Sequence, residues 1–397
     1  MRATYGIVAA LSASFSPASA AACSKQGLLL VSSYPIGNTV GGVTTFKLGN
    51  KGLEQVGELS TICGTNPSWQ TLVGEDQYYC INENWDTGNG TFTSAKINKD
   101  GTLAFLGNSS TPGGPVHIAL YGEGGKRAIT ANFASSSINA FSLDDPAKPQ
   151  SLENKAFPPR PDNKNIASRP HQAVVDPTGG FIVLPDLSVD VLHIFSVDQT
   201  SLALSELPVY TFENGTGPRH AAFFKSDSKT FLYVIAEKLN AIIGFDVSYG
   251  TNTLTLSQIF NIRTDGSNTV ARPGSTGAEI TISPDNKFLT VSTRNDTMVE
   301  YTLVDGKKIQ SDALNTFSID AGTGQLAHVQ TAPAGGILPR HFSFNKDGSL
   351  VAVACGGGGA DNNRVNVFQR DVATGKIGKA VGEALLATQV NHVIFKE

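Results

Sequence analysis

The chain has 397 residues, of which 40% are apolar and only 16% are charged, so it can bury a large core and is not a disordered chain. Its net charge of −4 and the lack of a basic run in the sequence argue against a nucleic-acid partner. The 41 glycines and 21 phenylalanines, beside 2 methionines, favour strands over helices, and we expect an all-β protein.

The N-terminus has the pattern of a targeting segment. Arg2 precedes a short apolar run, and the small residues 18–20 fit a cleavage site. We predict a signal peptide over residues 1–20, one folded domain over 21–397 and a secreted protein; an ordinary disordered N-terminus is the alternative. The apolar run is too short to cross a bilayer, and no other stretch approaches about 20 apolar residues. We therefore expect no membrane partner.

Secretion predicts glycosylation sequons and disulfide bonds. Four cysteines allow three pairings. We favour Cys63–Cys80, which closes a short loop, and Cys23 and Cys355 would then pair where the chain ends meet or stay free. The candidate glycosylation sites are Asn89, Asn108, Asn214 and Asn295.

One short pattern recurs along the chain about every 50–60 residues. Each copy has a small or proline-marked turn, then one polar or aromatic residue, then an alternating or apolar strand. We call the polar or aromatic residue the marker. A strand-rich repeat of this length predicts a β-propeller. The markers are Trp69, His117, His171, His220, Glu279, His341 and His392.

The rest of each repeat predicts three more strands. A hairpin turn, such as residues 176–179, leads to a β-branched or aromatic second strand. A third strand follows with an aromatic residue at a matching place, and then a looser fourth strand. The residues that we assign to the aromatic place are Phe46, Phe141, Phe195, Phe245, Tyr301 and Phe368.

The two chain ends complement each other. Residues 28–34 resemble a second strand with no inner strand before it, and residues 391–395 form an inner strand with no blade after it. We therefore predict a seven-bladed β-propeller with four-stranded blades, closed by N- and C-terminal strands that share one blade. Closure leaves no free sheet edge. A stack of β-sandwich domains is the alternative, but it would not need complementary strands at the two ends.

Blade geometry places a polar cluster at one mouth of the channel. The marker stands at the start of the inner strand, and the second strand returns antiparallel, so its last residue lies at the same mouth. The residues expected there are His117, His171, Arg219, His220, Glu237, Glu279, Arg294, Arg340, His341 and His392. Arginine and carboxylate pairs of this kind bind anions and move protons.

Five of the 7 histidines are markers, which is not a random placement. Histidine could instead suit this position structurally, by bonding the backbone of a neighbouring blade. A zinc site requires ligand bonds near 2 Å, which markers spread around a ring do not obviously provide. The glycines after Cys355 lack a phosphate-loop motif, and no serine has a nucleophile-elbow motif. We expect no metal, no cofactor and no serine-hydrolase chemistry.

Five segments resemble those of the seven-bladed propeller lactonases, which include propeller-type 6-phosphogluconolactonases and fungal 3-carboxy-cis,cis-muconate cyclases. The segments are residues 169–187, 217–223, 231–237, 282–294 and 338–344. The resemblance implies a functional cluster of a histidine, an arginine, a glutamate and a second arginine. By position these catalytic residues are His171, Arg219, Glu237 and Arg294. The substrate-binding residues would be His117, His220, Glu279, Arg340 and His341.

Two functions follow as hypotheses. The first is a secreted, metal-independent lactonase or muconate-cyclase-like enzyme, whose partner is a small anionic lactone or carboxylic acid. Arg219 and Arg294 would bind the carboxylate and stabilise an enolate or oxyanion, while His171 and Glu237 would move the proton or activate water. The alternative is a catalytically inactive secreted glycoprotein with a binding or cell-surface role, because propellers host many functions. A glycan on Asn295, directly after Arg294, would crowd the mouth.

Overall fold

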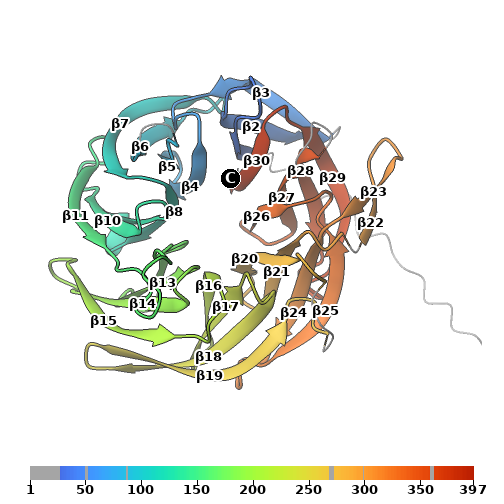
Figure 1. Ribbon diagram of the computed structural model, residues 1–397. Coiled ribbons are helices and arrows are strands. Elements are labelled where there is room, and N and C mark those ends of the chain that lie inside the picture. Colours follow the sequence, from blue (N-terminus) through green and yellow to red (C-terminus); the bar gives the residue numbers. More distant parts are fainter. Residues whose placement is uncertain (1–26, 50–51, 86–87, 268–271, 298, 358–361) are drawn as a thin grey trace, which may run out of the picture.

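The computed structural model describes residues 27–397 apart from 50–51, 86–87, 268–271, 298 and 358–361. Seven four-stranded antiparallel sheets surround a central axis, and each sheet is one blade (Figure 1). The prediction of an all-β, seven-bladed propeller is therefore confirmed. The predicted signal peptide and Cys23 lie outside the described residues.

The inner strand of each blade lines the channel, and in every blade except that of β12 it carries its marker near the start, as predicted. The strand that follows His171 is short, and Pro170 joins the sheet only through an isolated bridge to Asp186. The inner strands are β4 (Pro67–Val73), β8 (Pro115–Tyr121), β12 (Val174–Val175), β16 (Pro218–Lys225), β20 (Thr276–Ile282), β26 (Pro339–Phe344) and β30 (Gln389–Lys396).

The second strands are buried on both faces, because each blade packs between two neighbours. In β17 (Thr230–Ala236) every residue is buried, and alternate side chains join the hydrophobic clusters on either side. This double burial explains their almost uninterrupted apolar sequences. The other second strands are β1 (Leu28–Tyr34), β5 (Gln77–Asn82), β9 (Arg127–Asn132), β13 (Phe181–Asp186), β21 (Phe288–Arg294) and β27 (Leu350–Gly356).

The third strands carry the large aromatic side chains of the core between blades. Phe141, Phe195 and Phe245 are almost fully buried at the predicted place. The third strands are β2 (Gly42–Gly49), β6 (Asn89–Ile97), β10 (Ser137–Ser142), β14 (Val191–Val197), β18 (Ala241–Gly250), β24 (Ala313–Ile319) and β28 (Asn363–Arg370).

One prediction about the third strands was wrong. Tyr301 belongs to an extra hairpin of β22 (Val299–Thr302) and β23 (Lys308–Ser311), which projects from the ring in Figure 1. The third strand of that blade is β24, and its aromatic residue is Phe317, which is fully buried. The inserted hairpin has the same alternating pattern as a blade strand and comes first in the chain, so the sequence pattern indicated the hairpin instead of β24.

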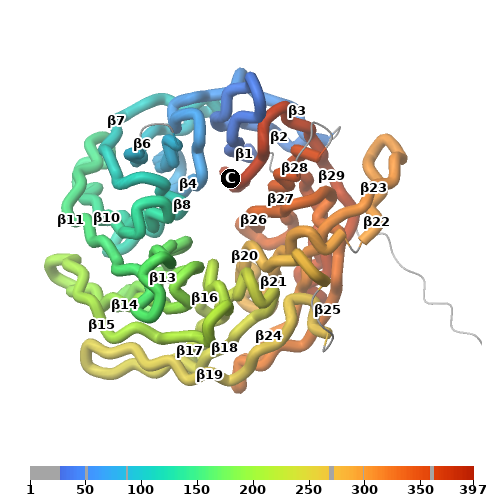
Figure 2. The backbone as a smooth tube through the Cα atoms, viewed as in Figure 1, coloured from blue at the N-terminus to red at the C-terminus, as the bar shows by residue number. Residues whose placement is uncertain are grey.

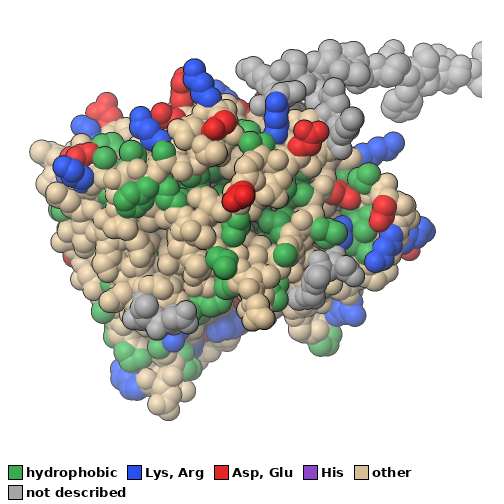
Figure 3. Space-filling model, turned by 90° about the horizontal axis from the view of Figure 1, so that it is seen from above, with side chains coloured by type: hydrophobic (Ala, Val, Ile, Leu, Met, Phe, Trp, Pro, Cys, Tyr) green, Lys and Arg blue, Asp and Glu red, His purple; other side chains and the backbone are tan. Residues whose placement is uncertain are grey.

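The fourth strands form the rim of the ring and are mostly exposed. Figure 3 shows the ring edge-on, with charged side chains of both signs scattered over this face. The fourth strands are β3 (Gly52–Ser60), β7 (Leu103–Pro112), β11 (Gln150–Ala156), β15 (Leu204–Thr211), β19 (Thr253–Arg263), β25 (Leu326–Pro333) and β29 (Ile377–Leu385); a 3₁₀ turn, η2 (Glu123–Gly125), precedes β9.

The chain ends close the ring as predicted. Strand β30 pairs antiparallel with β1, from Leu28 opposite Lys396 to Tyr34 opposite Gln389. Figure 2 shows the red C-terminal strand beside the blue N-terminal blade. The C-terminal strand thus supplies the inner strand of the N-terminal blade, together with its marker.

Candidate active site at one mouth of the channel

A β-bulge precedes the marker in every inner strand except β12. In β16, Pro218 pairs with Ala236 and His220 pairs with Ile235, so Arg219 is the extra residue. A bulge places two residues opposite one and redirects a side chain. The marker and the residue before it can therefore both face the channel mouth. The extra residues at this position are Ser68, Val116, Arg219, Ala278, Arg340 and Asn391.

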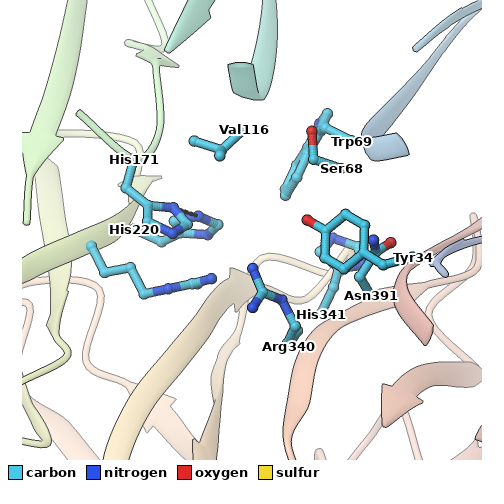
Figure 4. Close-up of a pocket in the computed structure, with 10 residues that line it drawn as sticks. Tyr34, Ser68, Trp69, Val116, His171, His220, Arg340, His341 and Asn391 are labelled. Atoms are coloured by element: carbon cyan, nitrogen blue, oxygen red, sulfur yellow. Dashed lines mark hydrogen bonds between the residues drawn. The ribbon is translucent and has the colours of Figure 1, made fainter. Parts of the chain in front are cut away.

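Most of the residues at these paired positions line a small pocket that is partly open to solvent. In Figure 4, His171 and His220 lie on one side, and Arg340 and Tyr34 lie across from them. The lining residues are Tyr34, Ser68, Trp69, Val116, His171, Arg219, His220, Arg340, His341 and Asn391.

The predicted catalytic cluster comes together through one carboxylate. Glu237 Oε2 lies 3.0 Å from Arg219 Nε and 2.8 Å from Arg294 Nη2. Arg219 also donates to the carbonyl of Ala278 at 2.5 Å, so its guanidinium has a fixed position. Burial and the neighbouring Arg294 lower the pKa of Arg219 to about 9, and burial lowers the pKa of Arg294. The Arg219 side chain therefore still carries a positive charge at neutral pH.

Two of the three histidines that line the pocket are linked to a buried carboxylate. His171 Nδ1 lies 3.1 Å from His220 Nε2, and His220 Nδ1 lies 2.8 Å from Glu279 Oε1. Burial lowers the pKa of both histidines well below the usual range, so both are neutral at pH 7. Burial raises the pKa of Glu279, while Arg219 and His341 oppose this shift.

This linkage determines where the proton of each ring lies. Glu279 Oε1 accepts from the backbone N–H of Ile280 at 3.0 Å. With the carboxylate ionised, the same oxygen accepts from His220, so His220 carries its proton on Nδ1 and accepts at Nε2. His171 must then donate from Nδ1, and its Nε2 keeps a free lone pair. The arrangement leaves a neutral imidazole base at the pocket wall.

The remaining markers surround Trp69, whose ring fills the channel below the pocket. The ring centroids of His117 and His392 lie 4.0 and 4.2 Å from that of Trp69. His341 stacks on His392 at 3.7 Å, and its Nε2 lies 3.8 Å from Glu279 Oε2. His117 and Glu279 are buried behind the pocket and do not line it.

The structural interpretation of the histidines holds for two of them. His117 Nδ1 accepts from the backbone N–H of Ala173 at 3.5 Å, and His341 Nδ1 accepts from that of Val393 at 3.4 Å. In each of these two hydrogen bonds, the histidine acceptor lies in one blade and the backbone donor lies in the next blade along the ring. These histidines therefore join neighbouring blades, as a structural role requires.

Arg340 differs from the other two arginines. It lines the pocket with its Cζ 5.7 Å from the ring centroid of Tyr34, and it has no ion-pair partner among the described residues. Arg219 and Arg294 share the carboxylate of Glu237, whereas the guanidinium of Arg340 is available to bind a ligand. A free guanidinium in a partly buried pocket is suited to a carboxylate or phosphate.

The sequence analysis missed five lining residues: Tyr34, Ser68, Trp69, Val116 and Asn391. Trp69 was identified as a marker but not as a site residue. Ser68, Val116 and Asn391 occupy the position before a marker, which Arg219 and Arg340 also occupy. That shared position in the repeat is the signal that could have identified them.

Other predictions have mixed outcomes. Cys63 and Cys80 form a disulfide as predicted, and Cys355 is a buried free thiol. Within the described ranges, no three His, Cys, Asp or Glu side chains are arranged to hold a metal ion, and no helix is long and apolar enough to cross a membrane. All four sequon asparagines are exposed, and their glycosylation remains a prediction: Asn89, Asn108, Asn214 and Asn295.

Fold and site together define a propeller with a basic, histidine-lined pocket at one mouth of its channel. The chain belongs to the lactonase family of seven-bladed β-propellers, whose family model matches residues 28–395. This finding confirms the family that the sequence motifs indicated.

Relatives with assigned names support the same family. The chain is 30% identical over 321 residues to a protein of Arthroderma benhamiae named "Probable 6-phosphogluconolactonase", a match that covers 79% of this chain and 76% of that protein. It is 24% identical to the 6-phosphogluconolactonase of Bacillus subtilis, a match that covers 79% of this chain and 85% of the relative.

Solved structures share the fold. The periplasmic gluconolactonase of Pseudomonas aeruginosa superposes with a TM-score of 0.74 at 22% identity, covering 94% of this chain and 99% of that one. A protein of Lactobacillus plantarum superposes with a TM-score of 0.76 at 21% identity, covering 94% and 100%. These likenesses support the blade count and the closed ring.

Proposed function

We propose that this protein is a metal-independent lactonase that hydrolyses a small anionic lactone in the pocket at the channel mouth. The observation that carries this proposal is the hydrogen-bond chain from Glu279 through His220 to Nδ1 of His171, which leaves Nε2 of His171 available in a pocket that Arg219 also lines. Membership of the lactonase family agrees with this chemistry.

In the proposed reaction, His171 Nε2 takes a proton from a water molecule as the water oxygen attacks the lactone carbonyl. The carbonyl oxygen becomes an oxyanion, which the Arg219 guanidinium stabilises. The ring C–O bond then breaks, and the leaving alkoxide takes the proton from His171. The product is an open-chain hydroxy acid, and the base returns to its neutral form.

The other charged groups position the reactants. Glu237 holds the guanidinium groups of Arg219 and Arg294 side by side through Oε2. Arg340, on the opposite wall, binds the acidic substituent of the substrate. A substrate held at both ends reacts faster because it is already oriented for attack.

The test is an assay of purified protein with 6-phosphogluconolactone and gluconolactone. The assay includes 3-carboxy-cis,cis-muconate, because the same base and cations suit proton transfer in a muconate-cyclase-type reaction. We expect His171→Ala to lower kcat/KM by about 10²–10⁴-fold. The matched control is His328→Ala, an exposed histidine on β25, which should keep full activity. Full activity of His171→Ala would contradict the proposal.

A catalytically inactive binding glycoprotein is the second candidate, and the position of Asn295 favours it. This asparagine is exposed and adjoins Arg294, so a glycan on it would stand beside the proposed site. Glycopeptide mapping decides between the two: a fully occupied Asn295, together with no activity in the assay above, would support the binding role.

We also propose that the protein acts outside the cell. The Cys63–Cys80 disulfide and the exposed sequons support an oxidising, secretory route. Mass spectrometry of the culture medium should detect a mature chain that begins at residue 21. Recovery of the chain only inside cells, with residues 1–20 retained, would contradict secretion.

A further inference from the structure

An exposed aromatic side chain stands at the rim of the pocket. Trp85 lies in the turn after β5, and its ring centroid is 4.9 Å from that of Tyr34, which lines the pocket. The side chain of Trp85 is 56% exposed. A large part of the indole is therefore accessible beside the pocket opening.

The position of this indole is fixed. Trp85 Nε1–H donates to Glu83 Oε2 at 2.8 Å, and the hydroxyl of Tyr34 donates to Glu83 Oε1 at 2.5 Å. One carboxylate thus holds both aromatic rings. A ring that is already held in place loses little conformational entropy when a ligand stacks on it, which favours binding.

Tyr34 connects this indole to the free cation of the pocket. The guanidinium of Arg340 lies 5.7 Å from the centroid of the Tyr34 ring and has no ion-pair partner among the described residues. An exposed indole and an unpaired guanidinium therefore border the same tyrosine. Single exposed hydrophobic residues are normal on protein surfaces. Trp85 differs from these because it is hydrogen bonded in place and adjoins an anion site.

We propose that Trp85 is a stacking subsite for a ring covalently attached to the anionic group that Arg340 binds. The ligand is thus a ring-bearing acid, such as an aryl or sugar phosphate or carboxylate. The ring lies on the indole, and the acid reaches Arg340 past Tyr34. This inference rests on the anion site of the proposed function, which it refines by giving the ligand a second recognised part.

The experiment compares ligands that share one anion and differ in the ring. Isothermal titration calorimetry of the full-length protein would use inorganic phosphate, phenyl phosphate and glucose 6-phosphate. We expect at least one ring-bearing phosphate to bind about fivefold or more tightly than inorganic phosphate. The ligand with the greater advantage shows whether the subsite takes an aromatic or a sugar ring.

Variants separate stacking from indirect effects. Trp85→Ala should abolish the advantage of the ring and leave the affinity for inorganic phosphate unchanged. Trp85→Phe keeps a ring but loses the bond to Glu83, and it should keep most of the advantage. Phe105→Ala removes an aromatic side chain that is 54% exposed on β7, away from the channel, and should change nothing.

Four outcomes would overturn the proposal. Equal binding of all three ligands by the wild type removes the subsite but leaves the anion site of the proposed function. An unchanged ring advantage in Trp85→Ala places the ring elsewhere in the pocket, for example on Trp69. A Trp85→Phe variant as weak as Trp85→Ala assigns the effect to the released Glu83. Absence of all phosphate binding contradicts the anion site as well as the subsite.

Discussion

At the scale of single residues, the site depends on a buried carboxylate that never touches the substrate. Glu279 does not line the pocket, yet its Oε1 accepts from the backbone N–H of Ile280 at 3.0 Å and bonds His220. Through His220 it determines which nitrogen of His171 is free. In the proposed reaction Glu279 and His220 are therefore positioning residues for the base His171.

Replacing the carboxylate by an amide tests this role. In Glu279→Gln the side chain is a neutral amide, which accepts the Nδ1–H of His220 less strongly than a carboxylate and therefore no longer holds His171 in the tautomer with a free Nε2. We expect kcat to fall by about 100-fold or more, with a smaller change in KM, because only the base is lost. Steady-state kinetics on the active lactone measure both constants. Glu300→Gln, an exposed residue of β22, is the control. An unchanged kcat for Glu279→Gln would contradict the inference that Glu279 fixes the tautomer of His171.

The buried histidines also make stability depend on pH. Burial lowers the pKa of His341 from 6.5 to about 4 in the folded protein. Between these values the unfolded chain binds a proton that the folded chain does not, so stability falls as the pH falls. The loss from His341 amounts to about 2 kcal/mol at pH 5.

Urea unfolding at pH 7 and pH 5 measures this contribution. His341→Asn should reduce the difference in free energy of unfolding between the two pH values by about 2 kcal/mol. His328→Asn should leave the difference as in the wild type, because His328 is exposed. Equal pH dependence of all three proteins would show that His341 does not remain neutral in the fold.

Sequence alone identified much of this residue-level arrangement. Arg219, Glu237 and Arg294 were predicted to form a catalytic set with His171, and the structure brings these three side chains into ion pairs, while their catalytic role stays a prediction. The chain from Glu279 to His171 was not predicted, because it depends on ring orientations that spacing does not contain. Tyr34 was missed for another reason: it ends the second strand of the N-terminal blade, whose marker His392 lies at the other end of the chain.

At the scale of strands, the bulges combine support of the ring with construction of the site. Asn391 Nδ2 donates to Pro67 O at 2.8 Å, and Ser68 Oγ donates to Pro115 O at 2.6 Å. Each of these residues occupies the bulge of one inner strand and bonds the inner strand of the next blade. In β16 and β26, the same bulge position is occupied by Arg219 and Arg340. A bulge has no compositional signature in these strands, so the sequence pattern could not predict that two successive residues face the pocket.

The corrected third strand leads to a prediction about stability. Phe317 is fully buried in β24, whereas Tyr301 belongs to the added hairpin and bonds Glu383 through its hydroxyl. Phe317→Ala should lower the free energy of unfolding by about 3–5 kcal/mol. Tyr301→Phe removes only a hydrogen bond and should cost about 0.5–1.5 kcal/mol. Chemical denaturation measures both losses of unfolding free energy. A larger loss for Tyr301→Phe than for Phe317→Ala would show that Tyr301, and not Phe317, is the core aromatic residue of this blade.

At the scale of the whole molecule, ring closure and the site share one strand. The sequence predicted this closure because two incomplete blades at the chain ends had complementary missing strands. Strand β30 completes the N-terminal blade and also carries Asn391 into the pocket and His392 against Trp69. Opening the ring between β30 and β1 therefore removes site residues at the same time as it exposes the edge of the N-terminal sheet at β1.

Because ring closure and the site share β30, a mutation at the contact between β30 and β1 should lower both the stability of the fold and the temperature at which activity is lost. Val393 is fully buried in β30 and packs in one cluster with Leu29 and Val31 of β1. Val393→Ala should lower the free energy of unfolding by about 1–3 kcal/mol, and lactonase activity should be lost at a correspondingly lower temperature.

The matched control is Val209→Ala, because Val209 is 43% exposed on β15 and should change stability by less than about 0.5 kcal/mol. Thermal unfolding followed by fluorescence, with activity measured on the same samples, gives both transitions. If Val393→Ala lowered the unfolding temperature but activity persisted beyond it, the site would not require the closed ring.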